Sequence, residues 1–148
     1  MEVRDPISGI LKGKDGPVWS IAPGATVYEA LELMADKEIG ALLVEHGGEI
    51  VGLLSERDYA RKIILMGRSS RTTTVGEIMV SPPITVTADC SVDEAMRTMT
   101  QHRVRHLPVL NRSGRALGIV SIGDCVKWVI TSHEKTIEQL HSYIAGQF

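Results

Sequence analysis

The chain has 148 residues, a net charge of −2 and only 4% aromatic residues. This length suffices for one domain, or for two very small domains that share a core. A DNA-binding surface needs a basic excess, and a stacking platform for single-stranded nucleic acid needs aromatic residues, so neither is expected. The cysteines Cys90 and Cys125 form no CxxC or zinc spacing, and the five histidines show no metal-ligand pattern. We therefore expect no metal site and no nucleic-acid partner.

The distribution of apolar residues gives no sign of export or membrane insertion. The N-terminal stretch lacks the apolar core of a signal peptide, and no apolar run approaches membrane-spanning length. We therefore expect a cytoplasmic protein without membrane contact.

Local signals in the first half predict a short helix and then a β-α-β-β-α series. Asp5 and Pro6 match a helix N-cap and first turn, and Gly13 ends that helix. Downstream, Thr26 and Glu29 form a capping box that opens a longer helix. The elements expected after the short helix are a strand at 18–22, a helix from the capping box to about Lys37, strands at 41–45 and 49–54, and a helix from Ser55 to Gly67 with Tyr59, Ile63 and Ile64 turned inward.

The second half predicts the same series after a connecting segment. Residues 68–74 are polar and are typical of a linker, and Thr74–Glu77 starts a second short helix. The remaining expected elements are a strand at 84–87, a helix opened by the capping box Ser91–Glu94, strands at 106–110 and 115–120, and a helix opened by Ser121–Asp124. The expected organisation is a first domain at 1–67 that includes the N-terminal helix, a linker with a short helix at 68–82, a second domain at 83–132 and a helical tail at 133–148.

This internal repeat is the strongest feature of the sequence. Val27 and Met34 recur 65 residues later as Val92 and Met99, and the offset becomes 66 after one residue inserted in the second hairpin. The other matches are Glu29, Ala30, Leu42 and Val44 with Glu94, Ala95, Leu107 and Val109, and Gly52, Ser55 and Asp58 with Gly118, Ser121 and Asp124. Each half has about 60 residues, which is marginal for an independent core. A βαβ step plus a hairpin leaves one sheet face bare, so we expect an α+β or α/β fold whose halves pack sheet to sheet about a pseudo-two-fold axis.

The motif Gly-x-x-Ser-x-x-Asp ends the hairpin in both halves. Ser55 with Asp58, and Ser121 with Asp124, have the spacing of a helix capping box. The same junction could also bind a nucleotide, because a helix N-terminus attracts phosphate and a carboxylate accepts hydrogen bonds from both hydroxyls of a ribose. The two interpretations are compatible, since one serine can cap a helix and also face a ligand.

Several motifs, in order and twice, resemble those of cystathionine-β-synthase (CBS) domains. They are the Pro/Thr-rich strand Pro83–Thr87, the helix that carries Ala and Met, the run Arg105–Val109 and the Gly-x-x-Ser-x-x-Asp motif. Each half resembles a CBS domain and the pair resembles a Bateman module, from about Pro6 to Lys127. The resemblance implies a non-catalytic sensor that binds AMP, ADP, ATP, NAD(H) or a similar adenosyl ligand between its domains. It also implies association into a homodimer of four CBS units.

The first half departs from this family pattern. It has Gly40-Ala-Leu-Leu where the second half has Arg-His-Leu-Pro, and its first strand holds Trp19-Ser-Ile-Ala22. The two clefts are therefore not expected to be equivalent, and only one of them need hold a ligand.

Candidate binding residues follow from the chemistry of an adenine nucleotide. Adenine needs flat apolar contacts, ribose should meet Asp58 or Asp124, and phosphate should meet Ser55 or Ser121 together with a cation. Arg103 is a leading candidate because the guanidinium fork binds phosphate through two hydrogen bonds. The complete candidate set is Ser20, Ile21, Ala22, Gly40, Ala41, Leu42, Ser55, Arg57, Asp58, Arg61, Thr85, Val86, Thr87, Arg103, Arg105, His106, Leu107, Pro108, Ser121, Gly123 and Asp124. Core packing for the aliphatic residues, helix-end charge for the arginines and a backbone partner for His106 are the structural alternatives.

The last segment of the chain carries an apolar stripe in steps of four and three. Its members are Val126, Ile130, His133, Ile137, Leu140 and Ile144. This is the heptad spacing of a helix that packs on another helix, either in its own domain or in a second copy. Thr136 and Gln139 have a further capping-box spacing, which predicts a break near Glu134.

Two other functions compete with the nucleotide sensor. One is a dimeric interaction module whose clefts bind nothing and which regulates a partner by contact. The other is a redox or metal sensor that uses Cys90 and Cys125. No neighbouring cysteine in the sequence could resolve an oxidised one locally, which argues against the redox function.

Overall fold

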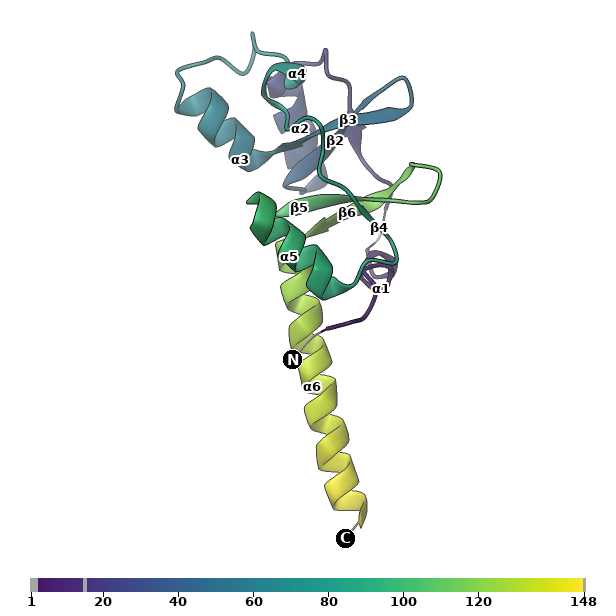
Figure 1. The fold of residues 1–148 in the computed structure, drawn as a ribbon. Helices are drawn as coiled ribbons and strands as arrows, with labels where there is room; N and C mark the ends of the chain where they lie inside the picture. Colours follow the sequence, from purple (N-terminus) through teal and green to yellow (C-terminus); the bar gives the residue numbers. More distant parts are fainter. Residues whose placement is uncertain (1–2, 15, 148) are drawn as a thin grey trace.

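A computed structural model describes residues 3–14 and 16–147. It contains two three-stranded sheets with strand orders β1-β2-β3 and β4-β5-β6 (Figure 1). The strands are β1 (Ser20–Ile21), β2 (Ala41–His46), β3 (Glu49–Ser55), β4 (Val86–Thr87), β5 (His106–Leu110) and β6 (Ala116–Ser121). The helices are α1 (Ser8–Lys12), α2 (Val27–Lys37), α3 (Glu56–Tyr59), the π-helical segment η1 (Ala60–Ile64), α4 (Val75–Ile78), α5 (Val92–His102) and α6 (Ile122–Gln147).

The two sheets have the same strand pairing and an irregularity at the same position. In each sheet the first strand pairs parallel with the second, and the second pairs antiparallel with the third. A register shift falls between Val44 and Glu45 in one sheet and at the equivalent step, Val109 to Leu110, in the other. The repeat predicted from the sequence is therefore confirmed in three dimensions.

The long helices begin where the capping residues predict and end in matching conformations. The Glu29 backbone N–H donates to the Thr26 hydroxyl oxygen and the Thr26 N–H donates to the Glu29 carboxylate, both at 3.1 Å. Helices α2 and α5 each end at a non-glycine residue in the left-handed region, Glu38 (φ 54°) and Arg103 (φ 55°). A left-handed residue is a common end of an α-helix, although glycine usually holds the position, so the two repeats end their equivalent helices in the same way.

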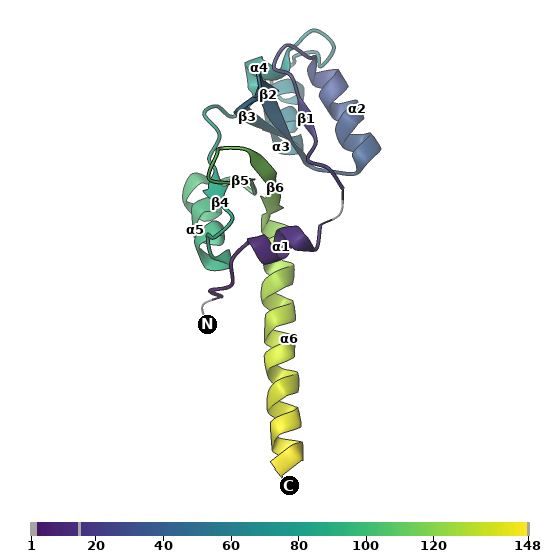
Figure 2. The same ribbon diagram turned by 90° about the vertical axis from the view of Figure 1, so that its right-hand side faces the viewer.

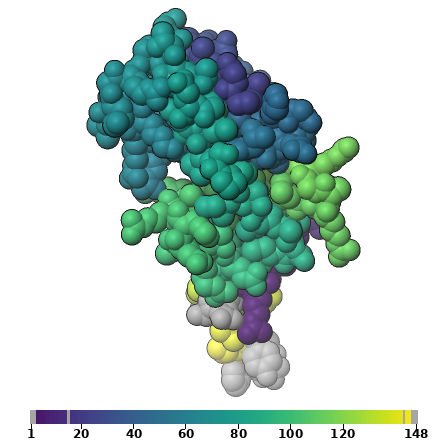
Figure 3. All heavy atoms as spheres, turned by 45° about the horizontal axis from the view of Figure 1, so that its top comes forward, coloured from purple at the N-terminus to yellow at the C-terminus, as the bar shows by residue number. Residues whose placement is uncertain are grey.

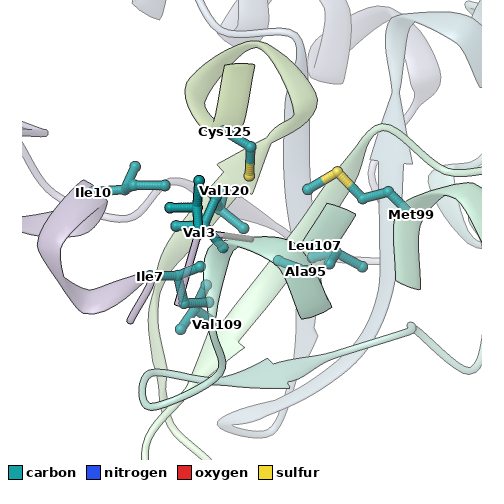
Figure 4. Packing of buried hydrophobic residues seen from close by; sticks show 10 residues of the cluster. Val3, Ile7, Ile10, Ala95, Met99, Leu107, Val109, Val120 and Cys125 are labelled. Atoms are coloured by element: carbon teal, nitrogen blue, oxygen red, sulfur yellow. The ribbon is translucent and has the colours of Figure 1, made fainter. Parts of the chain in front are cut away.

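The hydrophobic cores place the two short helices differently from the organisation expected from the sequence. The N-terminal segment, expected with the first repeat, contributes Val3, Ile7 and Ile10 to the core of the second repeat, as Figure 4 shows. Helix α4 lies in the connecting segment, yet it contributes Val75 and Ile78 to the core of the first repeat. Each repeat thus completes its core with a short helix from outside its own β-α-β-β-α series.

The two repeats pack sheet against sheet, as predicted. Ala41, Leu43 and Leu53 of the first sheet form a small buried cluster with Ala116 and Ile119 on β6 and with Ile50 on β3. The space-filling view shows the two repeats in direct contact, with the green second repeat below the blue and teal first repeat (Figure 3). This shared cluster has fewer buried residues than the core of either repeat.

Four local predictions were wrong in detail. Helix α1 begins at Ser8, after Ile7, and the Asp5 carboxylate accepts a hydrogen bond from the Trp128 indole N–H (3.0 Å) rather than capping a helix. Strands β1 and β4 are two residues long and shorter than predicted; Val18 and Trp19 before β1 line one cleft described below, and Ile84, at the start of the strand predicted at 84–87, lines the other.

The other two corrections concern the helices that follow the hairpins. Ile64 is 58% exposed, because the wider π-helical turn, with the Leu65 N–H bonded to the Ala60 carbonyl oxygen at 3.2 Å, rotates it outward. Helix α6 is continuous, without the predicted break near Glu134. The Thr136 hydroxyl donates to the Ser132 carbonyl oxygen at 3.0 Å, so this side chain is used inside the helix and does not cap a new one.

Candidate functional site

Two clefts lie at the boundary between the repeats. The Trp19 cleft has a volume of about 460 Å³ and is lined by Leu11, Lys14, Gly16, Pro17, Val18, Trp19, Lys37, Glu38, Ile39, Gly40, Ala41, His106, Leu117, Gly118, Ile119 and Ser121. The Arg103 cleft has a volume of about 320 Å³ and is lined by Gly40, Leu53, Ser55, Glu56, Arg57, Asp58, Val80, Ile84, Arg103, Val104, Arg105 and His106. Both volumes fall in the range of small-molecule sites.

Each cleft combines parts of both repeats. The Arg103 cleft takes the Ser-x-x-Asp junction of the first repeat and the α5–β5 turn of the second. The Trp19 cleft takes the α2–β2 turn of the first repeat and the β6 end of the second. Gly40 and His106 line both clefts, and a Cβ atom on Gly40 would lie 3.6 Å from the His106 Nε2 atom. A ligand in either cleft would therefore touch the two repeats at once.

Ser55 and Asp58 form the floor of the Arg103 cleft and also cap α3. The Asp58 N–H donates to the Ser55 Oγ (3.3 Å), and the Asp58 Oδ2 accepts from the Ser55 N–H (2.9 Å) and hydroxyl (3.0 Å). The other carboxylate oxygen of Asp58 pairs with Lys62 at 3.3 Å. The capping-box interpretation is thus confirmed, and the same hydrogen bonds hold the carboxylate in one orientation beside the cleft.

Three guanidinium groups face the same cavity. Arg103 stands at the left-handed residue that ends α5, Arg105 follows it, and Arg57 comes from α3 of the other repeat. Within residues 3–14 and 16–147, none of these three side chains makes a hydrogen bond or ion pair. Arg103 and Arg105 are exposed and Arg57 is half-buried, and unpaired guanidinium groups around a carboxylate are suited to an anionic ligand that also carries hydroxyl groups.

His106 lies between the two clefts and is half-buried. Burial is the main reason that its pKa is lowered from the ordinary value. The positive charge of Lys14 lowers the pKa further, and the carboxylates of Asp124 and Glu56 oppose the shift. The neutral imidazole is therefore favoured near pH 7, with one ring nitrogen to donate and one to accept a hydrogen bond.

The Trp19 cleft has different chemistry at the equivalent positions. Glu38 stands where the other cleft has Arg103, and Gly40 and Ala41 stand where it has Arg105 and His106. The Lys37 ammonium lies 4.4 Å from the centre of the Trp19 ring. This cleft therefore lacks the arginine cluster and presents an aromatic wall beside a lysine.

The carboxylate of the second junction is covered by a lysine. Asp124 caps α6, with its N–H bonded to the Ser121 Oγ (3.0 Å) and its Oδ2 bonded to the Ser121 N–H (2.8 Å). Lys14 pairs with the same carboxylate at 2.6 Å and donates to the Ile119 carbonyl oxygen at 2.7 Å. Lys14 lines the Trp19 cleft, whereas Asp124 does not. Burial alone would raise the pKa of Asp124, but the hydrogen bonds from Lys14 and from the Ser121 backbone outweigh it, and the pKa is lowered.

The structure brings some of the predicted site residues to the clefts and places others elsewhere. Those that line a cleft are Gly40, Ala41, Ser55, Arg57, Asp58, Arg103, Arg105, His106 and Ser121. Those that line neither cleft are Ser20, Ile21, Ala22, Leu42, Arg61, Leu107, Pro108, Gly123 and Asp124. Leu42 and Leu107 are fully buried, because the central strands β2 and β5 turn them into the cores. Thr85, Val86 and Thr87 line a separate open hollow that also contains Cys90 and Glu94.

Several lining residues were missed by reasoning from the sequence. Those with side chains at the cavities include Lys14, Lys37, Glu38, Leu53, Glu56, Ile84 and Val104. The repeat offset could have identified Glu38, since it aligns with Arg103 at the end of the equivalent helix. Lys14 carries no local signal, because its partner is distant in the chain and the contact arises only from packing.

Comparisons with known proteins agree with this architecture. The sequence model of the CBS domain matches residues 14–65 and 75–131, so the chain belongs to the CBS domain family as a tandem pair. It is 42% identical over 151 residues to a mitochondrial CBS domain-containing protein of Arabidopsis thaliana (CBSX3), covering 96% of this chain and 73% of that one. Proteins of this type are typically regulatory or signal-transduction modules and not enzymes.

Solved structures give the same result. A protein with CBS domains from Burkholderia ambifaria superposes with a TM-score of 0.81 at 47% identity, covering 86% of this chain and 95% of that one. A CBS domain protein of Pyrobaculum aerophilum, solved in complex with AMP, superposes with a TM-score of 0.72 at 27% identity, covering 81% and 89%. Among the described residues, no helix is both long and apolar enough to cross a bilayer. The cytoplasmic location stays a prediction, since the Arabidopsis relative is mitochondrial.

Proposed function

We propose that this CBS pair senses an adenine nucleotide, which binds in the Arg103 cleft and changes the arrangement of the two repeats. One observation carries the proposal. The Ser55–Asp58 junction of the first repeat faces Arg103, Arg105 and His106 of the second repeat across a single cavity of about 320 Å³. A nucleotide offers ribose hydroxyls to the carboxylate and phosphate oxygens to the cations.

The cleft contains groups that suit the ribose, the phosphate and the adenine of a nucleotide. The ribose hydroxyls would donate to the Asp58 carboxylate, which its own cap hydrogen bonds already orient. The phosphate would accept from the arginine side chains, since the Ser55 hydroxyl already donates to Asp58. Leu53, Val80 and Ile84 supply an apolar wall for the adenine ring. The AMP complex of the Pyrobaculum relative supports an adenine nucleotide as the ligand class. The particular ligand is proposed to be AMP, ADP, ATP or NAD(H).

A bridging ligand can act on the angle between the repeats. The cluster that joins the two sheets is small, so several arrangements differ little in free energy. A nucleotide that contacts both repeats favours the arrangement in which the Asp58 and Arg103 sides are at the right separation. This differential affinity would be the signal that a partner reads.

The Trp19 cleft is proposed to bind such a nucleotide more weakly. It holds Glu38 in place of Arg103, and Asp124, which is paired with Lys14, does not line it. We therefore expect one nucleotide per chain, in the Arg103 cleft.

The proposal is tested by titrating purified, nucleotide-free protein with AMP, ADP, ATP, NAD and NADH in a calorimeter. We expect one site per chain for at least one of these ligands. At about 100 times the dissociation constant, that ligand should add roughly 2.7 kcal/mol to the free energy of unfolding and raise Tm by about 2–8 °C.

The control for arginine variants of the site is Arg61→Ala. Arg61 lies on the same helical stretch as Arg57 but lines neither cleft. Its affinity should equal that of the wild type. An absence of heat and of any Tm shift with every ligand would reject the sensor and favour the interaction module.

A further inference from the structure

Helix α6 extends well beyond the folded body. It has 26 residues, which corresponds to a length of about 39 Å. Its first turns pack on the second repeat through Cys125, Trp128 and Val129. All described side chains from His133 to Ala145 are exposed, and both ribbon views show the helix running away from the two sheets (Figures 1 and 2).

An apolar seam runs along the exposed side of this helix. Val126, Ile130, Ile137, Leu140 and Ile144 are between 42% and 56% exposed and follow the alternating steps of a heptad, with His133 in the remaining position. In heptad notation the a positions are Ile130, Ile137 and Ile144, and the d positions are Val126, His133 and Leu140. The residues that contact the body, Cys125, Trp128 and Val129, hold other positions of the heptad, so the body leaves the seam uncovered.

We propose that this seam binds the same seam of a second copy, forming a parallel two-stranded coiled coil. On one side the stripe is bounded by the polar e positions Lys127, Glu134 and His141; on the other side the g positions are Val129, which packs on the body, Thr136 and Tyr143. Repeating apolar a and d positions bounded by polar e positions are the pattern of a coiled coil. Isoleucine at all three a positions, with leucine at the d position 140, favours two parallel strands.

Charge and polarity along the seam also favour the parallel orientation. In a parallel pair each g residue lies near an e residue of the other copy, and the pairs Val129–Glu134 and Thr136–His141 bring no like charges together. His133 then faces His133, and every isoleucine faces an isoleucine. An antiparallel pair would bring Glu134 against Glu134 and would pack His133 on Ile137. A polar residue matched with itself in one core layer also fixes the register.

The test is sedimentation velocity on the full chain, with one seam variant and one matched variant. Wild type should form dimers, and Ile137→Glu should raise the dimer dissociation constant at least tenfold, because it places a carboxylate in an apolar layer. Gln139→Glu introduces the same group at a c position of the same turn and should leave the dissociation constant unchanged. Tryptophan fluorescence and circular dichroism check that both variants keep the folded body.

A cross-linking experiment tests the orientation. In a parallel pair Ile144→Cys meets its own copy and should give a disulfide-linked dimer under mild oxidation, compared with wild type treated in the same way. In an antiparallel pair residue 144 lies near residue 126, about 27 Å further along the helix, and no such product forms. A monomeric wild type, or a dimer that Ile137→Glu leaves unchanged, would overturn the proposal. An uncross-linked Ile144→Cys dimer would overturn the parallel orientation.

Discussion

The ammonium group of Lys14 lies 2.6 Å from the carboxylate of Asp124, and its hydrogen bond to the Ile119 carbonyl oxygen ties the same side chain to β6. The contact joins the segment after α1 to the first turn of α6, which are near opposite ends of the chain. It holds the N-terminal helix on the second repeat and covers the carboxylate of one of the two Ser-x-x-Asp junctions. The two clefts therefore differ in electrostatics although their backbones repeat.

Lys14→Ala should weaken this attachment. The pair is partly exposed, so we expect a loss of about 0.5–1 kcal/mol in the free energy of unfolding at pH 7. The pKa of Asp124 is lowered in the folded state, so its stabilising contribution is present above the unfolded pKa and is lost as the pH falls through the folded value. The difference between wild type and variant should shrink below about pH 4, the ordinary range of an aspartate.

Urea unfolding at pH 7 and at low pH measures this difference. Lys12→Ala, a change at the exposed lysine that ends α1, is the control and should cost little. A Lys14→Ala protein as stable as wild type at neutral pH would contradict the assigned role of the ion pair.

The glycine of each Gly-x-x-Ser-x-x-Asp motif lies in close contact with a neighbouring segment of the chain. A Cβ atom on Gly52 would lie 2.5 Å from the Met79 sulfur and 3.0 Å from the Val80 carbonyl oxygen. A Cβ atom on Gly118 would meet only the end of the Leu11 side chain, at 2.9 Å. Gly52→Ala should therefore destabilise by about 1–3 kcal/mol, and Gly118→Ala by less, because a side-chain end can move and a backbone oxygen cannot. Thermal unfolding of the two variants side by side decides the order.

Removal of the Arg103 guanidinium should weaken nucleotide binding without harming the fold. Arg103 has φ 55°, which glycine adopts without strain, so Arg103→Gly should keep or raise Tm. The loss of a charged hydrogen bond to phosphate, worth about 1.5–3 kcal/mol, should weaken binding roughly 10- to 100-fold. Calorimetric titration with the best ligand of the wild type gives the ratio. Equal affinities would remove Arg103 from the proposed site.

His106 should make stability depend on pH. Its pKa is lowered in the folded protein, mainly by burial and then by Lys14, so the unfolded chain binds a proton more readily. Stability should therefore fall as the pH drops below about 6.5, the ordinary histidine value. His106→Gln cannot take up the proton, and its Tm should decline less between pH 8 and pH 5. A wild type and variant with parallel Tm profiles would contradict this effect.

Both cysteines should resist alkylation in the folded protein. Burial is the main cause that raises the pKa of Cys90 and of Cys125 to about 11, so very little thiolate exists at pH 8. Cys125 is buried in the core of the second repeat and Cys90 packs half-buried against it, as the residue type led us to expect. Iodoacetamide at pH 8 should modify neither thiol in native protein and both after unfolding, as read by mass spectrometry. Rapid native labelling would revive the redox alternative.

Local patterns in the sequence predicted the elements and the architecture. The capping boxes at Thr26 and Ser55 join groups three residues apart, and the repeat is visible as residues that match at an offset of 65 and then of 66. Wherever a single turn or a pairing of adjacent strands decides the conformation, the spacing of residue types is sufficient evidence. The exceptions within helices, such as the exposed Ile64, arose where a π-helical turn changed the period that the pattern assumes.

The composition of the clefts was decided only by the tertiary structure. The pseudo-two-fold packing brings the junction of one repeat, with Asp58, to the helix end of the other, with Arg103, and no spacing in the sequence pairs them. The same packing placed α1 on the second repeat and brought Lys14 onto Asp124. Local hydrogen bonds join residues a few positions apart, so they require given residue types at a fixed spacing that can be recognised in the sequence. Contacts between the repeats depend on how the two folded sheets pack together. The sequence by itself therefore indicated many of the residues that line the clefts, whereas which of them face one another was decided by the packing.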